Sequence, residues 1–392
     1  MDIINTMIDI NDDTKIIIGR DKDINVLYDE ENNDITHIYL NNLNHFLQNP
    51  KLATRKILEW WEIRSWTHIQ DNKFLNKEKN SWGHNPNEPL LGFGSCNNNR
   101  LFTWGKTIKE EWEENLLFNS YFYPQKQYRL LKILRANTSS GIIIEHVTES
   151  TKMLYFSFRE MTSTSEIWQW FTGIFNLIDI SKCQGVRKMP REMYINKGIW
   201  DHSYTNYNEK GNIRQQILDF INNSGIDLKV YDEIVLIGMS LGACICQYIC
   251  LDLIWRLDRN KITMILFGSP RVYTPNVIKF LNKKGVICLR FEMDSFDDPP
   301  GFPCPHSNFF IQWKHLGVSI RMNSDVHYVV DDVIRNKCMY YLTREKKCNK
   351  MPYKPLALLQ GTYNLHSRLP YSLHIYYAAR KFDRHIPSVY KE

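Results

Sequence analysis

The feature that most constrains the fold is a short apolar strand that runs directly into a sharp turn and a helix. The apolar run IVLIG leads into Gly238-Met239-Ser240-Leu241-Gly242, and a helical stretch begins at Ala243. This is a GxSxG motif in the strand, turn and helix context of a nucleophile elbow. Glycines are expected at both ends of the motif, because the elbow is strained and neighbouring backbone passes close to it. The pattern predicts that Ser240 is a nucleophile at the C-terminal edge of a sheet.

Two other interpretations of this stretch are open. Residues 234–251 carry no charge and approach the length of a membrane span, but they include two glycines, a serine and a glutamine. The serine could also merely cap the helix that follows it. The nucleophile interpretation is favoured, because a helix N-terminus below the serine would stabilise negative charge as it develops.

The second part of the chain alternates between strand-like and helix-like patterns. Apolar runs bounded by turn residues predict strands, and apolar residues three or four apart predict helices. Such alternation is typical of an α/β fold with a mostly parallel central sheet flanked by helices. The predicted strands are 231–240, 261–269 and 283–293, and the predicted helices are 213–221 and 241–257.

The first part of the chain has a different pattern. Residues 52–70 predict a helix whose tryptophans, Trp60, Trp61 and Trp66, share a face that indicates a core contact more than a ligand platform. Residues 106–137 also predict helix, because charged and apolar residues alternate at a helical period.

A change from helices to a sheet follows, since residues 140–160 form two β-rich runs around a polar turn. We therefore divide the chain into two parts. Residues 1–100 form a mainly helical or irregular N-terminal extension of unknown role. Residues 101–392 form the α/β domain.

Composition argues against several classes of protein. The chain has 392 residues, of which 43% are hydrophobic and 23% charged, so it has enough apolar mass for a substantial core. Its net charge of +6 is too weak to argue for nucleic acid. Residues 1–40 hold ten acidic and three basic residues, net −7, and leave +13 on the rest. The excess positive charge on the rest of the chain could favour binding to an anionic lipid surface, but an ordinary solvated surface is the simpler interpretation.

The cysteines indicate the redox environment. There are nine, an odd number without a CxxC pair, which argues against a zinc ribbon and against a complete disulfide framework. We therefore expect reduced thiols. The N-terminus is acidic and lacks a basic region followed by an apolar run, so we expect no secretory signal and a cytoplasmic location.

A serine nucleophile needs a base, and the base needs a carboxylate that orients it, so an acid and a histidine are expected after Ser240. The predicted strand 283–293 leads into an acidic loop. Beyond this loop lie His306, His315, His327, His366, His374 and His385. Composition alone does not choose among them.

Four landmarks together resemble the class 3 lipases, the fungal triacylglycerol-lipase-like branch of the α/β-hydrolases, over roughly residues 106–381. Residues 238–244 match the family's GHSLGGA elbow, and residues 266–273 match its TFGSPRVG segment. Residues 158–167 resemble its FRGTxSxxDW segment, and residues 195–199 resemble its HxGF segment. The elbow and the TFGSPRVG segment are specific when they occur together. The resemblance implies an α/β-hydrolase fold.

The resemblance also selects the partners of the serine. The family's DxVPxLP pattern implies Asp297 as the acid, with Asp294 and Asp298 as alternatives. Its C-terminal HxxYF motif implies His374 as the base. Its YxHVG motif falls on His315, which implies a structural histidine, although His315 stays an alternative base.

The oxyanion segment departs from the family. The family's Gly-Thr pair is Glu160-Met161 here, so the threonine hydroxyl is absent unless a one-residue shift brings Thr162 into place. The N–H groups of Met161 and Leu241 are expected to form the oxyanion hole, since the hole needs N–H donors more than any side chain. Loss of one donor usually costs about 100- to 1,000-fold in turnover, so the substitution could slow an enzyme without abolishing its activity.

Residues 165–178 occupy the position of the family's lid and carry an aromatic stripe. A lid that opens at an oil or membrane surface would expose these aromatic side chains to lipid, whereas the alternative is a buried amphipathic helix. The resemblance implies a substrate that is a lipid or other acyl ester, at a membrane or droplet surface.

The resemblance implies a serine hydrolase that cleaves carboxylic ester bonds of lipids through an acyl-enzyme, as a lipase, phospholipase or esterase. It implies no metal, no organic cofactor and no nucleic acid. One alternative is a catalytically weak or inactive hydrolase-fold interaction protein, favoured by the Glu160-Met161 pair and the extension. Another is a peptidase or thioesterase with the same mechanism and a different pocket.

Overall fold

The computed structural model describes about two fifths of the chain. The described residues are 6–10, 14–18, 50–67, 122, 128–136, 140–160, 177–179, 194–197, 200, 212–254, 256–257, 261–293, 315–322, 328–330, 371, 375–376, 378–380 and 382–386. The main strands are β1 (Thr6–Ile10), β2 (Thr14–Ile18), β3 (Tyr128–Arg135), β4 (Ser140–Val147), β5 (Lys152–Phe158), β8 (Glu233–Met239), β9 (Ile262–Phe267), β10 (Ile287–Met293), β11 (Val318–Met322) and β12 (Tyr328–Val330). The helices are α3 (Pro50–Ser65), α8 (Ile213–Asn223), α9 (Leu241–Leu253) and α10 (Pro275–Lys283), with a 3-10 turn, η4 (Leu228–Val230).

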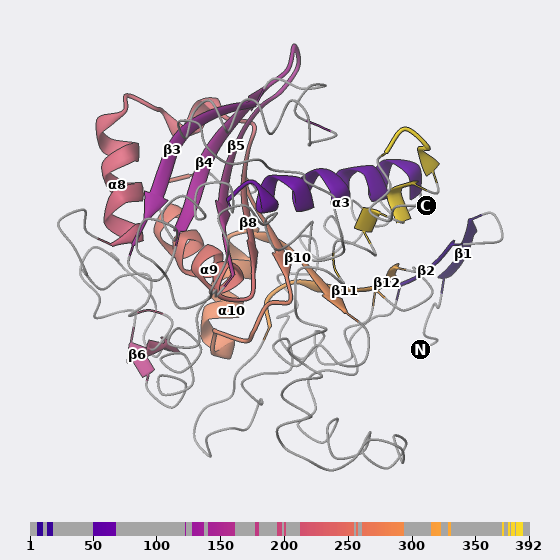
Figure 1. Ribbon diagram of the computed structural model, residues 1–392. Helices are drawn as coiled ribbons and strands as arrows, with labels where there is room; N and C mark the ends of the chain where they lie inside the picture. Colours follow the sequence, from indigo (N-terminus) through magenta and orange to yellow (C-terminus); the bar gives the residue numbers. More distant parts are fainter. Residues whose placement is uncertain are drawn as a thin grey trace, which may run out of the picture.

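Within these residues the main strands form one sheet in the order β1-β2-β12-β11-β10-β9-β8-β5-β4-β3 (Figure 1). Strands β5, β8, β9, β10 and β11 run parallel to one another, β4 and β3 extend the sheet antiparallel beyond β5, and β12 pairs antiparallel with β11. A separate antiparallel pair is formed by β6 (Leu177–Asp179) and β7 (Tyr194–Asn196). A mostly parallel centre with helical connections is the architecture of an α/β-hydrolase, as the sequence predicted.

The parallel register brings the C-terminal ends of the central strands to one edge. Met239 pairs with Phe267, and Phe267 pairs with Phe291. Phe158 at the end of β5 pairs with Gly238. The loops that follow β5, β8, β9 and β10 therefore all leave the sheet at the edge where Ser240 lies, and ligand sites in open α/β sheets lie outside this edge.

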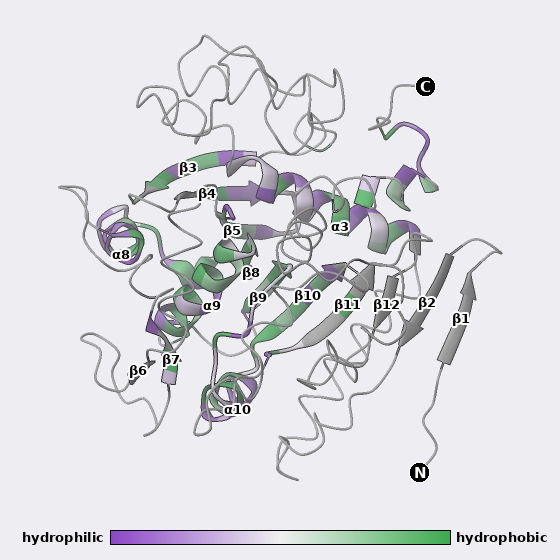
Figure 2. Ribbon diagram, turned by 60° about the horizontal axis from the view of Figure 1, so that its bottom comes forward, coloured by the Kyte–Doolittle hydropathy of each residue, from purple (hydrophilic) through white to green (hydrophobic). Residues whose placement is uncertain are grey.

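Helices cover both faces of the sheet, with α8, α9 and α10 on one side and α3 on the other (Figure 2). Alternate residues of β8 face opposite sides, since Leu236 packs in the core with α9 while Val235 and Ile237 pack in the core with α3. Burial on both faces explains why this strand is an uninterrupted apolar run.

Helix α3 lies within the predicted N-terminal extension and forms the second layer of the core. Trp60, Trp61 and Trp66 are buried, which confirms the core face predicted for them. The Trp61 ring lies edge-on to Phe267 of β9 at 4.9 Å and stacks on Tyr371 at 5.7 Å, measured between centroids. The sheet thus packs between α9 and a layer built from both ends of the chain.

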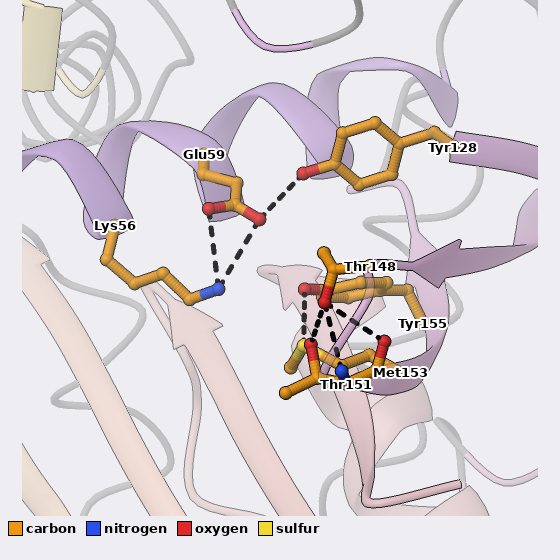
Figure 3. Close-up of polar contacts among 7 residues, drawn as sticks. All are labelled: Lys56, Glu59, Tyr128, Thr148, Thr151, Met153 and Tyr155. Carbon is orange, nitrogen blue, oxygen red and sulfur yellow. Dashed lines mark hydrogen bonds and ion pairs between the residues drawn. The ribbon is translucent and has the colours of Figure 1, made fainter. Parts of the chain in front are cut away.

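Polar side chains on α3 are also buried, and each has partners. Glu59 accepts a hydrogen bond from the Tyr128 hydroxyl at 2.6 Å and pairs with Lys56 at 3.3 Å (Figure 3). Glu62, one turn further along α3, accepts hydrogen bonds from the Phe122 N–H at 3.2 Å and from the hydroxyl of the buried Tyr376 at 2.9 Å. A carboxylate is costly to bury unless it is paired, so these contacts fix the position of α3 on the sheet.

One predicted element is wrong. Residues 128–135 lie within the stretch predicted as helix and instead form β3, which pairs antiparallel with β4 apart from a register shift between Leu130 and Lys132. The predicted strands around residues 140–160, the strands β8, β9 and β10, and the helices α3, α8 and α9 are confirmed. The uncharged stretch that approached a membrane span is divided between β8 and α9. Among the described residues no helix is long and apolar enough to cross a membrane.

The described cysteines carry free thiols, as predicted. Cys244, Cys246, Cys250 and Cys288 are all buried between α9 and the sheet. Burial raises the pKa of Cys288 to about 12 and raises the pKa values of the three thiols on α9 further. Such thiols stay protonated at neutral pH and act as apolar packing groups.

Candidate active site

Ser240 has the backbone conformation of a nucleophile elbow. Its φ is 52° and its ψ is −117°, and it is the one non-glycine residue with positive φ in the part of the chain that the structure describes. The Ser240 N–H donates to the Phe267 carbonyl at 3.0 Å, so β9 holds the turn in place. Strained residues persist only where the surrounding structure fixes them, and they concentrate at functional sites.

The two glycines of the motif are required by close packing of backbone. A Cβ at Gly238 would lie 2.3 Å from the Gly242 carbonyl carbon, and a Cβ at Gly242 would lie 2.4 Å from the Phe158 carbonyl oxygen. Both are far below a real Cβ contact, and neither neighbour is a side chain that could move away. The elbow therefore closes tightly against itself and against the end of β5, as the sequence predicted.

Ser240 does not cap α9 through its side chain. It occupies the N-cap position, but its hydroxyl makes no capping hydrogen bond. The alternative in which this serine merely caps the helix is therefore not supported. The first N–H groups of a helix have no partner within the helix, and the N-terminus favours negative charge. Leu241, the first residue of α9, places such an N–H next to the serine.

The segment after β5 crosses the start of α9. The Phe158 and Arg159 carbonyl oxygens both approach Gly242, two residues after the serine. Glu160 is buried and forms an ion pair with Arg64 of α3, and the Arg159 Nη1 donates to the Glu160 carbonyl oxygen at 2.7 Å. Met161, the other predicted oxyanion donor, lies outside the described residues, as does Thr162.

The predicted acid also lies outside the described residues, together with its alternatives Asp294 and Asp298. The described chain reaches Met293, four residues before Asp297, at the end of β10 and the same edge as Ser240. Within β10, Glu292 is fully buried and accepts a hydrogen bond from Arg290 at 2.5 Å.

The parallel register separates His315 from the serine. The Leu316 carbonyl accepts from the Arg290 Nε, in the middle of β10, at 3.1 Å, and the next residue lies against the start of that strand. A Cβ on Gly317 would lie 2.1 Å from the Cys288 carbonyl oxygen. Cys288 is level with Leu236, four residues before the serine, which is about 13 Å along the strands. His315 therefore lies toward the edge opposite Ser240, which argues against its being the base.

The neighbours of His374 lie near the elbow, although His374 itself is outside the described residues. Tyr371, three residues before it, lies with its hydroxyl 3.5 Å from the Phe291 carbonyl of β10. The Tyr371 ring is 6.3 Å from the ring of Phe267, the residue whose carbonyl binds the Ser240 N–H. These contacts bring the C-terminal segment to the nucleophile's edge of the sheet.

Other predicted features are not described by the structure. The lid stretch 165–178 is outside the described residues apart from its end in β6. Among the described side chains, no group of three or more His, Cys, Asp or Glu residues is arranged to hold a metal ion. The ion pair between α3 and Glu160 was missed from the sequence, where the only signal was the replacement of the family's glycine by a glutamate.

Comparison with known proteins agrees with the resemblance. Residues 156–295, about a third of the chain, match the family model described as Lipase (class 3). A comparison with curated protein sequences gives no match.

Matches among solved structures are distant. A lipase from Rhizopus microsporus var. chinensis is 21% identical, with a TM-score of 0.40, 53% of this chain covered and 64% of that one. The Rhizomucor miehei triacylglyceride lipase is 21% identical, with a TM-score of 0.36 and coverages of 50% and 66%. A triacylglycerol lipase from Penicillium expansum is 16% identical, with a TM-score of 0.39 and coverages of 52% and 74%. The chain thus spans less than two thirds of the length of the first of these.

Proposed function

We propose that this chain, whose residues 156–295 belong to the class 3 lipase family, is a serine hydrolase that cleaves carboxylic ester bonds of lipids. The observation that carries the proposal is the strained Ser240 backbone, held by β9 and by two glycines that admit no side chain. A serine used only for packing or capping would not need this conformation, because an ordinary strand-to-helix turn leaves φ negative.

In the proposed mechanism Ser240 attacks the ester carbonyl while His374 takes its proton. His374 later returns that proton to the leaving alcohol, and Asp297 fixes the histidine tautomer and stabilises the imidazolium. The acyl group stays on Ser240 until water releases it as the carboxylic acid. No metal or organic cofactor enters these steps. Support for His374 over His315 comes from the contacts of Tyr371 with β9 and β10.

The oxyanion that forms during attack is bound by backbone N–H groups in this proposal. The Leu241 N–H lies at the N-terminus of α9, where the helix dipole also stabilises negative charge. The Met161 N–H is the second donor, carried by the segment that crosses Gly242. With both donors supplied by the backbone, the missing threonine hydroxyl of the family lowers the rate without removing the site.

Lipid esters are the proposed substrates, and the chain acts at a membrane or droplet surface through the aromatic lid at residues 165–178. A cytoplasmic location with peripheral membrane binding is part of this proposal. Triacylglycerols, phospholipids and lysophospholipids all contain the required bond. A thioester or a peptide bond would need the same nucleophile in a different pocket.

A comparison of turnover on four kinds of substrate tests the proposal. The wild type and Ser240→Ala are compared on a triacylglycerol emulsion, a phospholipid vesicle, an acyl thioester and a peptide. Hydrolysis of a lipid ester that disappears in Ser240→Ala supports the proposal, and faster turnover above the concentration at which the substrate forms an interface supports the lid. Preference for the thioester or peptide overturns the ester assignment. Absence of Ser240-dependent turnover on every substrate favours the interaction protein.

A further inference from the structure

The chain places a carboxylate where its family has a glycine, and an arginine from a distant helix neutralises it. Glu160 is the second residue after β5, and its carboxylate forms an ion pair with the guanidinium of Arg64. The Arg64 side chain is fully buried and that of Glu160 is 11% exposed. Arg64 belongs to the last turn of α3, where the helix dipole favours a cation.

Further contacts hold the same junction together. The Ser157 hydroxyl, on β5, donates to the Ile63 carbonyl of α3 at 3.3 Å. The guanidinium of Arg64 also lies over the Trp61 ring, 4.8 Å from its centroid. The end of α3 is therefore fixed to β5 and the segment after it through the Ser157 hydrogen bond and the ion pair, and the cation–π contact holds the Arg64 side chain against its own helix.

The main chain of Glu160 is held as well as its side chain. The Arg159 guanidinium donates to the Glu160 carbonyl oxygen at 2.7 Å. A peptide group is planar, so a contact that fixes the carbonyl also limits the direction of the N–H in the same group. That N–H belongs to Met161, one of the two donors proposed for the oxyanion.

Charge gives the ion pair a second consequence. An unpaired carboxylate beside the oxyanion site would repel the negative charge that develops on the substrate, and burial strengthens such effects. The Arg64 guanidinium cancels this repulsion. A glycine, which the family has at this position, brings no such charge, so this chain needs a compensating group that its relatives do not.

We propose that Arg64 and Glu160 are positioning residues for oxyanion binding. Through Arg64, helix α3 holds Glu160, whose peptide carbonyl shares a planar group with the Met161 N–H, and neutralises the Glu160 carboxylate. The proposal rests on the serine hydrolase function and adds that the N-terminal part of the chain sets the turnover rate without contacting the substrate.

The test compares Arg64→Met with Arg64→Lys, Glu160→Gln and the double variant Arg64→Met/Glu160→Gln. A misplaced donor next to a carboxylate that has lost its arginine lowers kcat by about 10- to 100-fold in Arg64→Met, with KM within about three-fold of the wild type. Arg64→Lys keeps the charge and loses less. Glu160→Gln also loses less, and the double variant recovers part of the loss, because both remove the uncompensated negative charge.

The matched control is Arg214→Met. Arg214 binds Asp252 in a bidentate pair at 2.8 to 3.0 Å, between α8 and the C-terminal part of α9, far along the helix from the elbow. Its loss lowers stability but leaves kcat per folded molecule within about two-fold. Each rate is divided by the folded fraction measured by near-ultraviolet circular dichroism, and if Arg64→Met does not fold, Arg64→Lys and Glu160→Gln carry the comparison.

The outcomes separate this inference from the function on which it rests. A fall in kcat for Arg64→Met that exceeds that of Arg214→Met, with recovery in the double variant, supports the positioning role. If Arg64→Met and Arg214→Met have equal kcat per folded molecule, the positioning role is overturned and the hydrolase function still stands. A wild type without Ser240-dependent turnover overturns both.

Discussion

The hydroxyl of Tyr376 donates a hydrogen bond of 2.9 Å to Oε1 of Glu62, and 314 residues of chain separate the two. Both side chains are buried, one on α3 and the other in the C-terminal segment. This contact joins the two ends of the chain on the face of the sheet opposite α9. His374 lies two residues before Tyr376 in the sequence, so the bond also anchors the segment that carries the proposed base.

Removal of this hydroxyl should destabilise the fold. Tyr376→Phe removes one hydrogen-bond donor from the buried Glu62 carboxylate, and such losses cost about 1–3 kcal/mol. The free energy of unfolding in urea measures the effect. Tyr371→Phe is the control, because that hydroxyl lies 3.5 Å from its acceptor and should cost less. Equal losses in the two variants would contradict the importance of the Glu62 contact.

The elbow glycine should tolerate no side chain. Gly242→Ala places a methyl group 2.4 Å from the Phe158 carbonyl oxygen, so backbone must move, at a cost of about 3 kcal/mol or more. Gly225→Ala tests backbone strain alone, since Gly225 has a φ of +70° with open space around it, and should cost about 1–2 kcal/mol. Thermal unfolding compares the two. A Gly242→Ala variant as stable as Gly225→Ala would show that the elbow is looser than described.

Stability should fall at alkaline pH. Burial raises the pKa values of Cys244, Cys246, Cys250 and Cys288 in the folded state, whereas an unfolded cysteine has a pKa of about 8.5. Below that value both states are protonated and nothing is lost. Above it the unfolded state releases protons that the folded state keeps, so each thiol removes about 1.4 kcal/mol per pH unit.

Urea unfolding at pH 7.5, 8.5 and 9.5 under reducing conditions measures this loss. Cys246→Ala should show a shallower pH dependence than the wild type, whatever its stability at pH 7.5. Buried Tyr376 adds to the loss above about pH 10, since its pKa is raised by burial and by Glu62. Identical slopes for Cys246→Ala and the wild type would mean that this thiol ionises in the folded state.

The triad assignment predicts unequal effects at the two histidines. His374→Ala should lower kcat by about 10,000-fold or more, because the serine loses its base, and Asp297→Asn should lower it by about 10,000-fold. His315→Ala should stay within a few-fold of the wild type, because its segment contacts Cys288 away from the serine. Ester hydrolysis with active-site titration measures all three. A large loss in His315→Ala alone would reverse the assignment.

Sequence patterns predicted the centre of the fold because its signals are local. Three adjacent segments make up this centre: the apolar run of β8, the glycines of the elbow and the apolar helix α9. The sequence of each segment alone predicts its local structure. Strand β3 was mispredicted for the opposite reason. Its sequence YRLLKILR spaces apolar residues as a helix does, and only pairing with β4 makes it a strand. Tertiary contacts override local propensity in such segments.

The candidate site shows the same division. The elbow serine was predicted from five consecutive residues, and its backbone conformation is described by the structure. The contact between Arg64 and Glu160 joins residues far apart in the chain, so no local pattern could indicate it. The departure from the family at Glu160 marked the position, but its partner Arg64 is identified only by the packing of α3 on the folded sheet.

Covalent labelling shows directly whether Ser240 is an activated nucleophile. Wild type and Ser240→Ala are treated with a fluorophosphonate, and intact mass is recorded with and without a lipid dispersion. We expect one adduct on the wild type, none on Ser240→Ala, and faster labelling with lipid. No adduct on a wild type that is shown to be folded, with lipid present or absent, would contradict the assignment of Ser240 as an activated nucleophile.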